Sequence, residues 1–229
     1  MKVVFVGPSL PDAVTFTMPQ IEIRPPAIQG DILKAVGEGA AVIGLIDGGF
    51  EYTAPVWHKE ILYALSKGVA VVGAASMGAL RAVECQSFGM VGLGRIFDDY
   101  ASGAVVDDAD VALLHAPMEL GFRAITLPMV NIRATVRRLR EQQTFSAAQA
   151  REIEMIASTL FFKHRTWPAL YSQCVKYGRD GAEVRARICH DHYVDQKRLD
   201  AMGLLQLVAD IEQGVIPAWT FQRTSLWRD

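Results

Sequence analysis

A serine at position 76 stands in a pattern that can present a nucleophile. Residues 73–78 read Gly-Ala-Ala-Ser-Met-Gly, between an apolar run and a stretch of helical composition. Small residues around the serine let a strand and a helix approach each other through a sharp turn. Such a turn exposes the serine oxygen and leaves the N–H of Met77 free to stabilise an oxyanion. The pattern is Ala-x-Ser-x-Gly rather than Gly-x-Ser-x-Gly, and a serine that only caps the helix is the alternative.

The same segment does not favour nucleotide binding. Gly73 and Gly78 have the spacing of the two glycines in a phosphate-binding loop, but Ala79 and Leu80 stand where Lys and Ser or Thr are required. The run 89–94, Gly-Met-Val-Gly-Leu-Gly, has the glycine spacing of the dinucleotide fingerprint in reverse. We therefore interpret Ser76 as a candidate for acyl chemistry.

A nucleophilic serine needs a group that accepts its proton. Lys59 is predicted about one turn into a helix after a parallel strand, and such a helix begins at the sheet edge where Ser76 lies. Lys67 ends that helix, roughly 12 Å further away at ~1.5 Å per residue. Trp57 and its apolar neighbours could desolvate Lys59 and favour the neutral amine that a base requires. His58 is the alternative base.

Asp47 ends a predicted strand at the same edge as Ser76. It could orient a lysine or bind substrate, whereas an ordinary turn with Gly48 is the competing interpretation. For Lys59 the competing interpretation is a solvated lysine on a helix surface. The sequence leaves these alternatives open.

Other polar groups give weaker indications. Residues 189–192 read Cys-His-Asp-His, but positions two apart on a helix do not share a face, so no metal site is predicted. The acidic residues between 98 and 110 could bind a divalent ion through oxygen, although a solvated loop is favoured. Cys85 could carry a persulfide, although its place inside a helix favours simple packing.

Four arginines follow one another on a predicted helix. Arg133 and Arg137 share a face by their spacing, and this face could dock an acidic carrier or a partner enzyme. A solvated face is the alternative for the distal members of the group. The group consists of Arg133, Arg137, Arg138 and Arg140.

The elements that must position these residues alternate between strand and helix in the first part of the chain. Apolar runs predict strands at 3–6, 41–46 and 69–74, and helices are predicted at 31–36, 55–67 and 78–86. Further strands are expected at 111–114 and 125–127, with helices from 129 onward. The pattern predicts an α/β fold, with a mostly parallel sheet in a three-layer core and a helical C-terminal region. We expect an α/β core over residues 1–145 and a helical extension over 146–229, packed on that core.

The composition of the chain limits the classes of binding partner and the cellular compartment that we expect. The 229 residues are 51% hydrophobic with a formal charge of −2, so clustered positive charge for nucleic acid is not indicated. Three scattered cysteines without CxxC spacing favour a reducing, cytoplasmic environment. No apolar run reaches the roughly 18 residues needed to cross a membrane, so we expect no membrane association.

Several segments together resemble the TfuA family. They are Trp-His-Lys-Glu-Ile-Leu at 57–62, the serine segment at 73–82, Pro-Met-Val-Asn-Ile-Arg-Ala-Thr at 128–135, and Gly-Pro-Ser-Leu at 7–10. The resemblance covers about residues 1 to 140. It implies a role in peptide backbone thioamidation beside a YcaO enzyme, which uses ATP to activate the amide oxygen. This chain itself is then expected to need no cofactor.

The resemblance also implies a reaction for the serine. TfuA-like proteins are associated with sulfur delivery from a small ubiquitin-like carrier that ends in a thiocarboxylate, and a Ser-Lys pair is implicated in hydrolysing it. Carried over by motif, that pair is Ser76 and Lys59. Met77, with an amide near Gly7 or Gly48, would hold the oxyanion. The remaining binding candidates are Ser9, Asp47, His58, Asn131 and Arg133.

Two other functions remain open at this point. In the first, the chain is a non-catalytic adaptor that recruits the peptide substrate and activates the YcaO enzyme, and Ser76 only caps a helix. In the second, the chain is a general serine esterase. Sulfide release measured together with partner binding discriminates the adaptor from the hydrolase, and turnover of simple acyl esters as fast as the carrier would favour the esterase.

Overall fold

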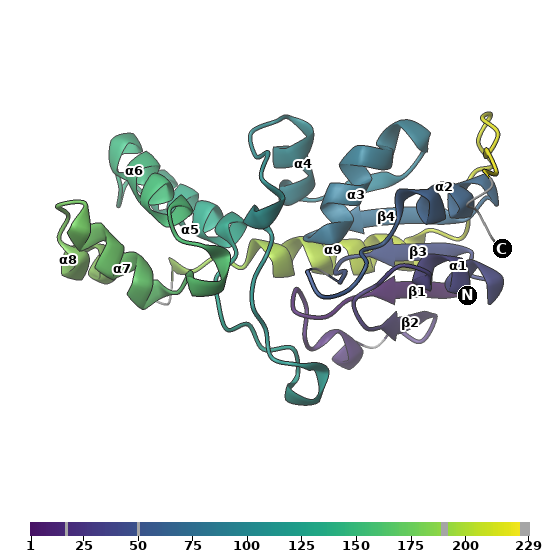
Figure 1. The fold of residues 1–229 in the computed structure, drawn as a ribbon, viewed down its shortest axis with the longest axis horizontal. Helices are drawn as coiled ribbons and strands as arrows, with labels where there is room; N and C mark the ends of the chain where they lie inside the picture. The colour runs from purple at the N-terminus through teal and green to yellow at the C-terminus, as the bar shows by residue number, and fades with distance from the viewer. Residues whose placement is uncertain (17, 50, 189–191, 225–229) are drawn as a thin grey trace.

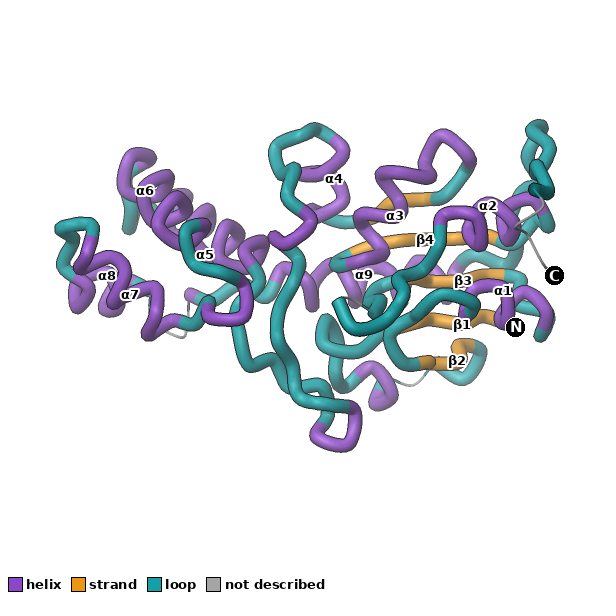
Figure 2. The backbone as a smooth tube through the Cα atoms, viewed as in Figure 1, coloured by secondary structure: helices purple, strands orange, loops and turns teal. Residues whose placement is uncertain are grey.

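The core of the molecule is a five-stranded parallel sheet. A computed structural model describes residues 1–16, 18–49, 51–188 and 192–224. In this part of the chain the strand order is β2-β1-β3-β4-β5, and every pairing is parallel (Figures 1 and 2). The strands are β1 (Lys2–Phe5), β2 (Ile21–Arg24), β3 (Val42–Leu45), β4 (Ala70–Ala74) and β5 (Val91–Leu93).

Helices cover both faces of this sheet. One face packs on α1 (Asp31–Gly37), α2 (His58–Ser66) and α3 (Met77–Cys85). The other face packs on α9 (Gln196–Asp210), whose buried side chains meet those of β1, β3 and β4. β1, β3 and β4 are apolar on both faces, as strands between two helical layers must be. The predicted three-layer α/β fold with a helical C-terminal region is confirmed.

A helical lobe lies beyond one end of the sheet (Figure 1). It contains α5 (Met129–Glu141), α6 (Ala147–Ser158), α7 (Trp167–Lys176) and α8 (Gly181–Arg187), which share a hydrophobic cluster of their own. The lobe therefore begins before residue 146, and α9 returns to the sheet. We expected a core over residues 1–145 and a helical extension over 146–229. In the structure α5, from the first range, packs in the lobe, and α9, from the second range, packs on the sheet.

Short elements connect these layers. α4 (Arg95–Ala101) follows β5, so the acidic stretch that begins at residue 98 starts inside a helix. Single 3-10 turns occupy Ala13–Thr15, Gln86–Phe88, Asp108–Asp110, Met118–Leu120 and Phe162–His164. Among the described helices, none combines the length and the apolar composition that crossing a membrane requires.

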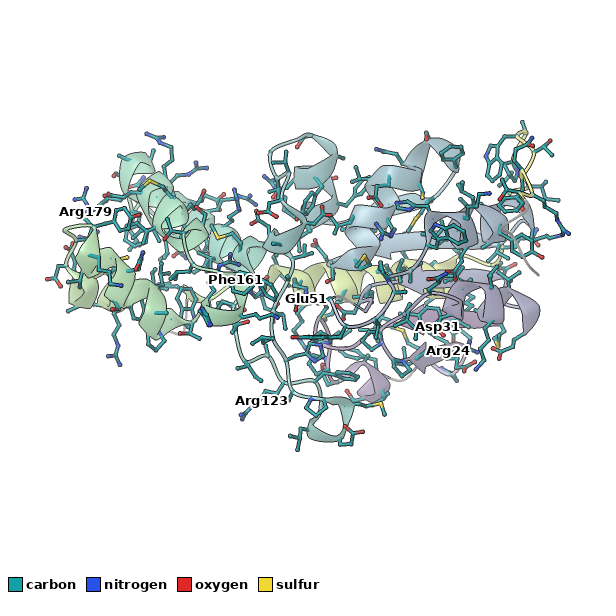
Figure 3. The ribbon with its side chains drawn as sticks, in the orientation of Figure 1. Arg24, Asp31, Glu51, Arg123, Phe161 and Arg179 are labelled. Atoms are coloured by element: carbon teal, nitrogen blue, oxygen red, sulfur yellow. The ribbon has the colours of Figure 1, made fainter. Side chains whose placement is uncertain are left out.

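The strands predicted at 111–114 and 125–127 are wrong. These residues lie in an extended loop, where one isolated antiparallel bridge joins His115 to Ala124. Two edge strands, β2 and β5, were not expected. β2 is short and partly charged, and its Arg24 forms ion pairs with Glu22 and Glu38 at the sheet edge (Figure 3). Short, charged edge strands discourage unwanted pairing, and for the same reason they lack an apolar signal.

The strand order reverses between β1 and β3. From β1 the chain moves outward to β2, and it then returns past β1 to form β3 on the other side. The connections that follow β1 and β3 therefore run in opposite directions. In open parallel sheets, ligands bind at such a point of reversal.

Candidate functional site at the carboxyl edge of the sheet

Ser76 stands on a tight turn between β4 and α3. The N–H of Ser76 donates to the carbonyl of Ala74 at 2.7 Å, which closes a three-residue turn around Ala75. Ala75 has a φ of +66°, a conformation that costs backbone energy in a residue with a β-carbon. The turn aims the chain from the strand into the helix within a few residues, as the sequence pattern predicts.

Gly78 makes this turn possible. A β-carbon added at Gly78 would lie 1.7 Å from the carbonyl oxygen of Leu45. The N–H of Gly78 donates a hydrogen bond to the carbonyl oxygen of Ile46 at 3.1 Å. The first turn of α3 is therefore pressed against the end of β3, where a side chain larger than hydrogen does not fit. Gly48, just past β3, meets the side chain of Met77 in the same way.

The Ser76 hydroxyl does not cap the helix that it begins. Its residue is half-buried, and within the described part of the chain its side chain has no hydrogen-bond partner. The Met77 N–H likewise has no acceptor among the described residues. An unengaged hydroxyl beside an unengaged N–H at a helix N-terminus is an arrangement that can attack a carbonyl and hold the resulting oxyanion.

Asp47 ties the loop after β1 to the end of β3. Its carboxylate accepts hydrogen bonds from the N–H groups of Gly7 and Ser9, both at 2.9 Å, and from the Ser9 hydroxyl at 2.6 Å. Asp47 and Ser9 are both buried. The loop after β1 is thereby fixed to the end of β3. The N–H of Gly7 is committed to Asp47, so Met77 and Gly48 remain as candidates for holding an oxyanion.

A buried lysine that the sequence analysis did not single out lies beside Asp47. The Nζ of Lys197, in the first turn of α9, is 3.9 Å from Asp47 Oδ1 and donates to Val111 O at 2.9 Å. Burial lowers the pKa of Lys197, while the negative charges of Asp47 and Asp195 oppose this effect. The signal was present in the sequence, because Lys197 falls on the helical stripe of Ala201, Leu204, Leu205 and Val208, where a solvated lysine is not expected.

The structure places Lys59 and His58 on the outer side of α2. The Nζ of Lys59 donates to Thr224 Oγ1 at 3.0 Å and to Gln222 O at 3.4 Å, in the C-terminal segment. His58 Nε2 lies 2.7 Å from Glu84 Oε2 on α3. Between the described residues, no hydrogen bond joins either side chain to Ser76. The role of Lys59 as a base stays a prediction.

Asn131 and Arg133 join parts of the fold that are distant in sequence. The buried Asn131 amide donates to Tyr193 OH at 2.8 Å and to Asp195 Oδ1 at 2.9 Å, and its oxygen accepts from the N–H of Lys197 at 3.1 Å. Arg133 pairs with the buried Asp110 at 2.8 Å. In this structure both residues support the site from outside the Ser76 turn.

The arginine face of α5 meets acidic groups of the same chain. Arg137 bonds Asp99 at 3.1 Å, as Arg133 bonds Asp110, whereas Arg138 and Arg140 are exposed. Acidic partners are thus supplied internally for the two arginines that share a face. An external acidic partner would meet only the distal pair.

The other sequence candidates have ordinary surroundings. Cys85 is buried in the core, and burial raises the pKa of its thiol to about 11, which disfavours a reactive thiolate. Of the run 189–192, only His192 lies within the described residues. Where residues are described, no cluster of three or more His, Cys, Asp or Glu side chains could hold a metal ion.

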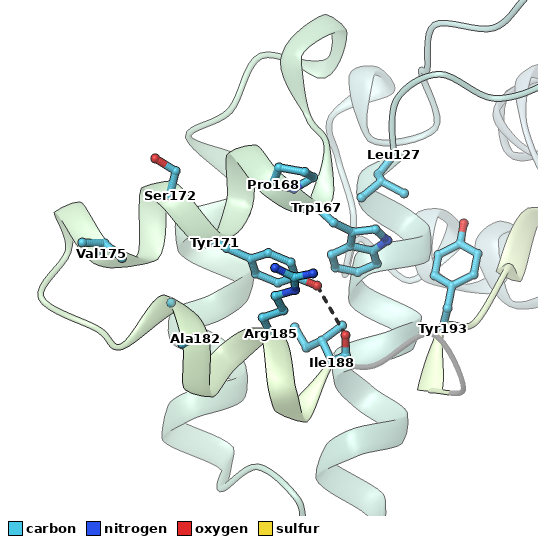
Figure 4. A pocket seen from close by; sticks show the side chains of 11 residues that line it. Leu127, Trp167, Pro168, Tyr171, Ser172, Val175, Ala182, Arg185, Ile188 and Tyr193 are labelled. Atoms are coloured by element: carbon cyan, nitrogen blue, oxygen red, sulfur yellow. Dashed lines mark hydrogen bonds between the residues drawn. The ribbon is translucent and has the colours of Figure 1, made fainter.

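A hollow lies in the helical lobe, and Ser76 is not among the residues that line it (Figure 4). It has a volume of about 940 Å³ and is lined by aromatic and apolar side chains, with Arg185 at its wall. Trp167 and Tyr171 stack at 6.1 Å between ring centroids, and Tyr171 donates to Ile188 O at 3.3 Å. The lobe also contacts the loop after β3, where Lys163 pairs with Glu51 (Figure 3).

Comparison with known proteins identifies the family of this chain. No curated protein matches the chain. The family model described as TfuA-like protein matches residues 47–166, which is just over half of the 229 residues and includes Asp47, the Ser76 turn and Arg133. This chain belongs to the TfuA-like protein family.

Proposed function

We propose that this chain is the partner of a YcaO-type enzyme in peptide backbone thioamidation. In this role it hydrolyses the thiocarboxylate end of a ubiquitin-like sulfur carrier and supplies sulfide, with Ser76 as nucleophile and a lysine as proton acceptor. The YcaO enzyme consumes ATP and acts on the peptide. Membership in the TfuA-like family supports the partnership.

One observation carries the hydrolytic part of the proposal. The hydroxyl of Ser76 is unengaged in the described structure, at a strained turn, next to the unengaged N–H of Met77. A serine whose function was to cap α3 would accept a hydrogen bond from the helix N-terminus, and Ser76 does not.

The reaction proceeds in two steps. The Ser76 oxygen bonds to the thiocarboxylate carbon and its proton passes to the amine, while Met77 N–H holds the oxyanion. The carbon–sulfur bond then breaks, and sulfur leaves as hydrosulfide with that proton. Water next adds to the acyl-serine and releases the carrier carboxylate, so that thiocarboxylate and water give carboxylate and hydrogen sulfide overall. Sulfide is a good leaving group, so one serine and one lysine suffice.

Sulfide release from a thiocarboxylated carrier tests this proposal. Ser76→Ala should reduce the rate by at least about 10³-fold, because the covalent route is lost. Ser87→Ala is the matched control, since Ser87 is exposed and distant from the turn. If Ser76→Ala releases sulfide at the wild-type rate, Ser76 has no part in the chemistry.

The hollow in the helical lobe favours a second candidate function, that of an adaptor. Its volume is within the range of roughly 300–1,000 Å³ that small ligands and side-chain anchors occupy, and it contains none of the hydrolytic candidates. Binding of the YcaO enzyme should be measured for the same variants. If Ser76→Ala keeps binding and loses sulfide release, the hydrolase is supported. If Arg185→Ala or Tyr171→Ala loses binding and keeps release, the lobe is the adaptor surface.

A further inference from the structure

The hollow in the helical lobe is a groove between α7 and α8, and both ends of α8 contact one residue of α7. A β-carbon added at Gly181, where α8 begins, would lie 2.8 Å from the carbonyl oxygen of Tyr171. After the last turn of α8, the carbonyl of Ile188 accepts a hydrogen bond from the Tyr171 hydroxyl at 3.3 Å. The groove, of about 940 Å³, therefore follows from how the two helices pack (Figure 4).

Aromatic rings form one wall of the hollow. Trp167 and Tyr171, one turn apart on α7, lie nearly parallel, with 16° between their planes and 6.1 Å between their centroids. Tyr193 meets Trp167 edge-on at 6.0 Å. Aliphatic lining comes from Leu127, Val175 and Ile188. Apolar surface that is left open in a groove of this size is suited to an apolar group of a ligand.

The charged and unengaged polar groups of the hollow are hydrogen-bond donors. The guanidinium of Arg185 has N–H groups and no acceptor atom. The indole N–H of Trp167 has no acceptor among the described residues. Within the described part of the chain, no Asp or Glu lines the hollow. A complementary ligand therefore combines an apolar body with a negative charge, and a carboxylate fits the fork of an arginine.

The charge of the whole lobe favours the same kind of ligand. Residues 129–188, which include α5 to α8, contain eleven Lys and Arg but five Asp and Glu, whereas the rest of the chain contains twelve and twenty. Arg179 and Arg187 pair with glutamates of the lobe. Arg185 is exposed and forms no ion pair with any described residue. The lobe thus attracts acidic partners, and Arg185 is the cation that the hollow offers them.

A nucleic acid is a poorer match than a protein segment. Binding to a phosphate backbone depends on several cations placed along its path. The described lining of the hollow holds a single cation, Arg185, among apolar side chains. One carboxylate beside one large apolar side chain satisfies this arrangement.

We propose that the hollow between α7 and α8 binds a linear acidic segment of a partner protein. A large apolar side chain of that segment lies against Trp167 and Tyr171, and a neighbouring carboxylate pairs with Arg185. Under the proposed function this partner is the YcaO enzyme, and the inference rests on that function only for the identity of the partner.

Selection from a phage library of random heptapeptides tests the chemistry of the hollow without any natural partner. The full chain is the bait, and phage that also bind Arg185→Glu are removed. Arg185 is exposed, so this variant should keep the fold. The enriched peptides should carry Asp or Glu close to Trp, Phe or Leu. No enrichment, or enrichment of basic or uncharged peptides, would overturn the proposal.

A labelled synthetic copy of the enriched peptide then measures affinity by fluorescence anisotropy. Arg185→Glu and Val175→Glu each place a negative charge at the hollow and should raise the Kd by at least about 10-fold. Val175 is exposed, so its replacement leaves the core intact. Arg151→Glu, an equal change of charge on the exposed face of α6, is the matched control and should keep the wild-type Kd. Equal affinities of all three variants would contradict the site.

Two other occupants have their own signatures. A uridine oligonucleotide that displaces the peptide would assign the hollow to a nucleic acid. Sedimentation that shows the wild-type chain associating with itself, and Arg185→Glu remaining monomeric, would assign it to a second copy. Either result overturns the proposal.

The inference and the proposed function fail in different ways. If peptide binding depends on Arg185 but the YcaO enzyme binds Arg185→Glu as it binds wild type, the acidic-peptide site stands and its partner is another protein. If the YcaO enzyme binds wild type and the variants equally, and no acidic peptide is enriched, the partnership stands and the inference fails.

Discussion

The side-chain oxygen of Asn131 accepts a hydrogen bond from the backbone N–H of Lys197 at 3.1 Å, across 66 residues of sequence. The same side chain donates to Asp195, whose carboxylate accepts the N–H of Arg198. One amide on α5 therefore fixes the N-terminus of α9. Since α9 covers a face of the sheet, this contact sets where the Lys197 amine enters the carboxyl edge.

Replacing Asn131 by alanine should destabilise the protein. The change leaves the Lys197 N–H and Tyr193 OH without their buried partner, and we expect a loss of about 2–4 kcal/mol in the free energy of unfolding. Urea denaturation measures it. Glu141→Ala, at the exposed end of the same helix, should change the value by less than about 0.5 kcal/mol. Equal effects of the two substitutions would show that α9 does not depend on Asn131.

Gly78→Ala tests the close approach of α3 to β3. The added methyl group would meet the backbone of Leu45, which no side-chain rotation can relieve, so we expect a loss of about 3 kcal/mol. Gly37→Ala is the matched control, because a β-carbon there meets nothing within 4 Å and the helix gains about 0.5–1 kcal/mol. A Gly78→Ala protein with wild-type stability and Ser76 reactivity would contradict the geometry of the turn.

The central strands could be predicted because each one is marked by its own run of apolar residues. β1, β3 and β4 are continuous apolar runs, and α2 and α3 follow at the expected places. The edge strands could not, since β2 alternates charged and apolar residues and β5 has three residues. The apolar residues at 111–114 resembled a strand, but Val111 is buried against helices rather than against a neighbouring strand.

The candidate site was predictable only in part, for a related reason. Ser76, Met77 and Asp47 follow strands, so their common edge is a consequence of parallel topology. The direction in which a helix turns a long side chain depends on what covers the helix. Lys59 faces the C-terminal segment, a contact between residues 165 apart in sequence, and Lys197 reaches Val111 across 86 residues.

Asp110→Ala should lower the free energy of unfolding, because it leaves the positive charge of Arg133 without its partner. Asp110 is 5% exposed and pairs with Arg133, and the positive charge of the buried Arg165 also acts on it. We expect destabilisation by about 3–5 kcal/mol, measured by urea unfolding. Asp108→Ala, exposed two residues earlier, should stay within about 0.5 kcal/mol of wild type. If both variants unfold like wild type, the pair contributes nothing to the fold.

The stability of the folded protein should depend on the protonation of Lys197. Burial holds the pKa of this amine below the ordinary value of 10.5 that it has in the unfolded chain. Between the lowered pKa and 10.5, the unfolded chain binds more protons than the folded one, so the contribution of this group to stability rises with pH. Below the lowered pKa the amine is protonated in the folded state as well, and the loss of stability caused by burying its charge is then complete.

Lys197→Met isolates this contribution, because methionine fills a similar volume and does not titrate. The free energy of unfolding of wild type minus that of Lys197→Met should increase as pH rises toward 10.5. Urea denaturation in a series of buffers measures this difference without any substrate. A flat difference for Lys197→Met would mean that the buried amine titrates as it does in the unfolded chain, and it would contradict the lowered pKa of Lys197.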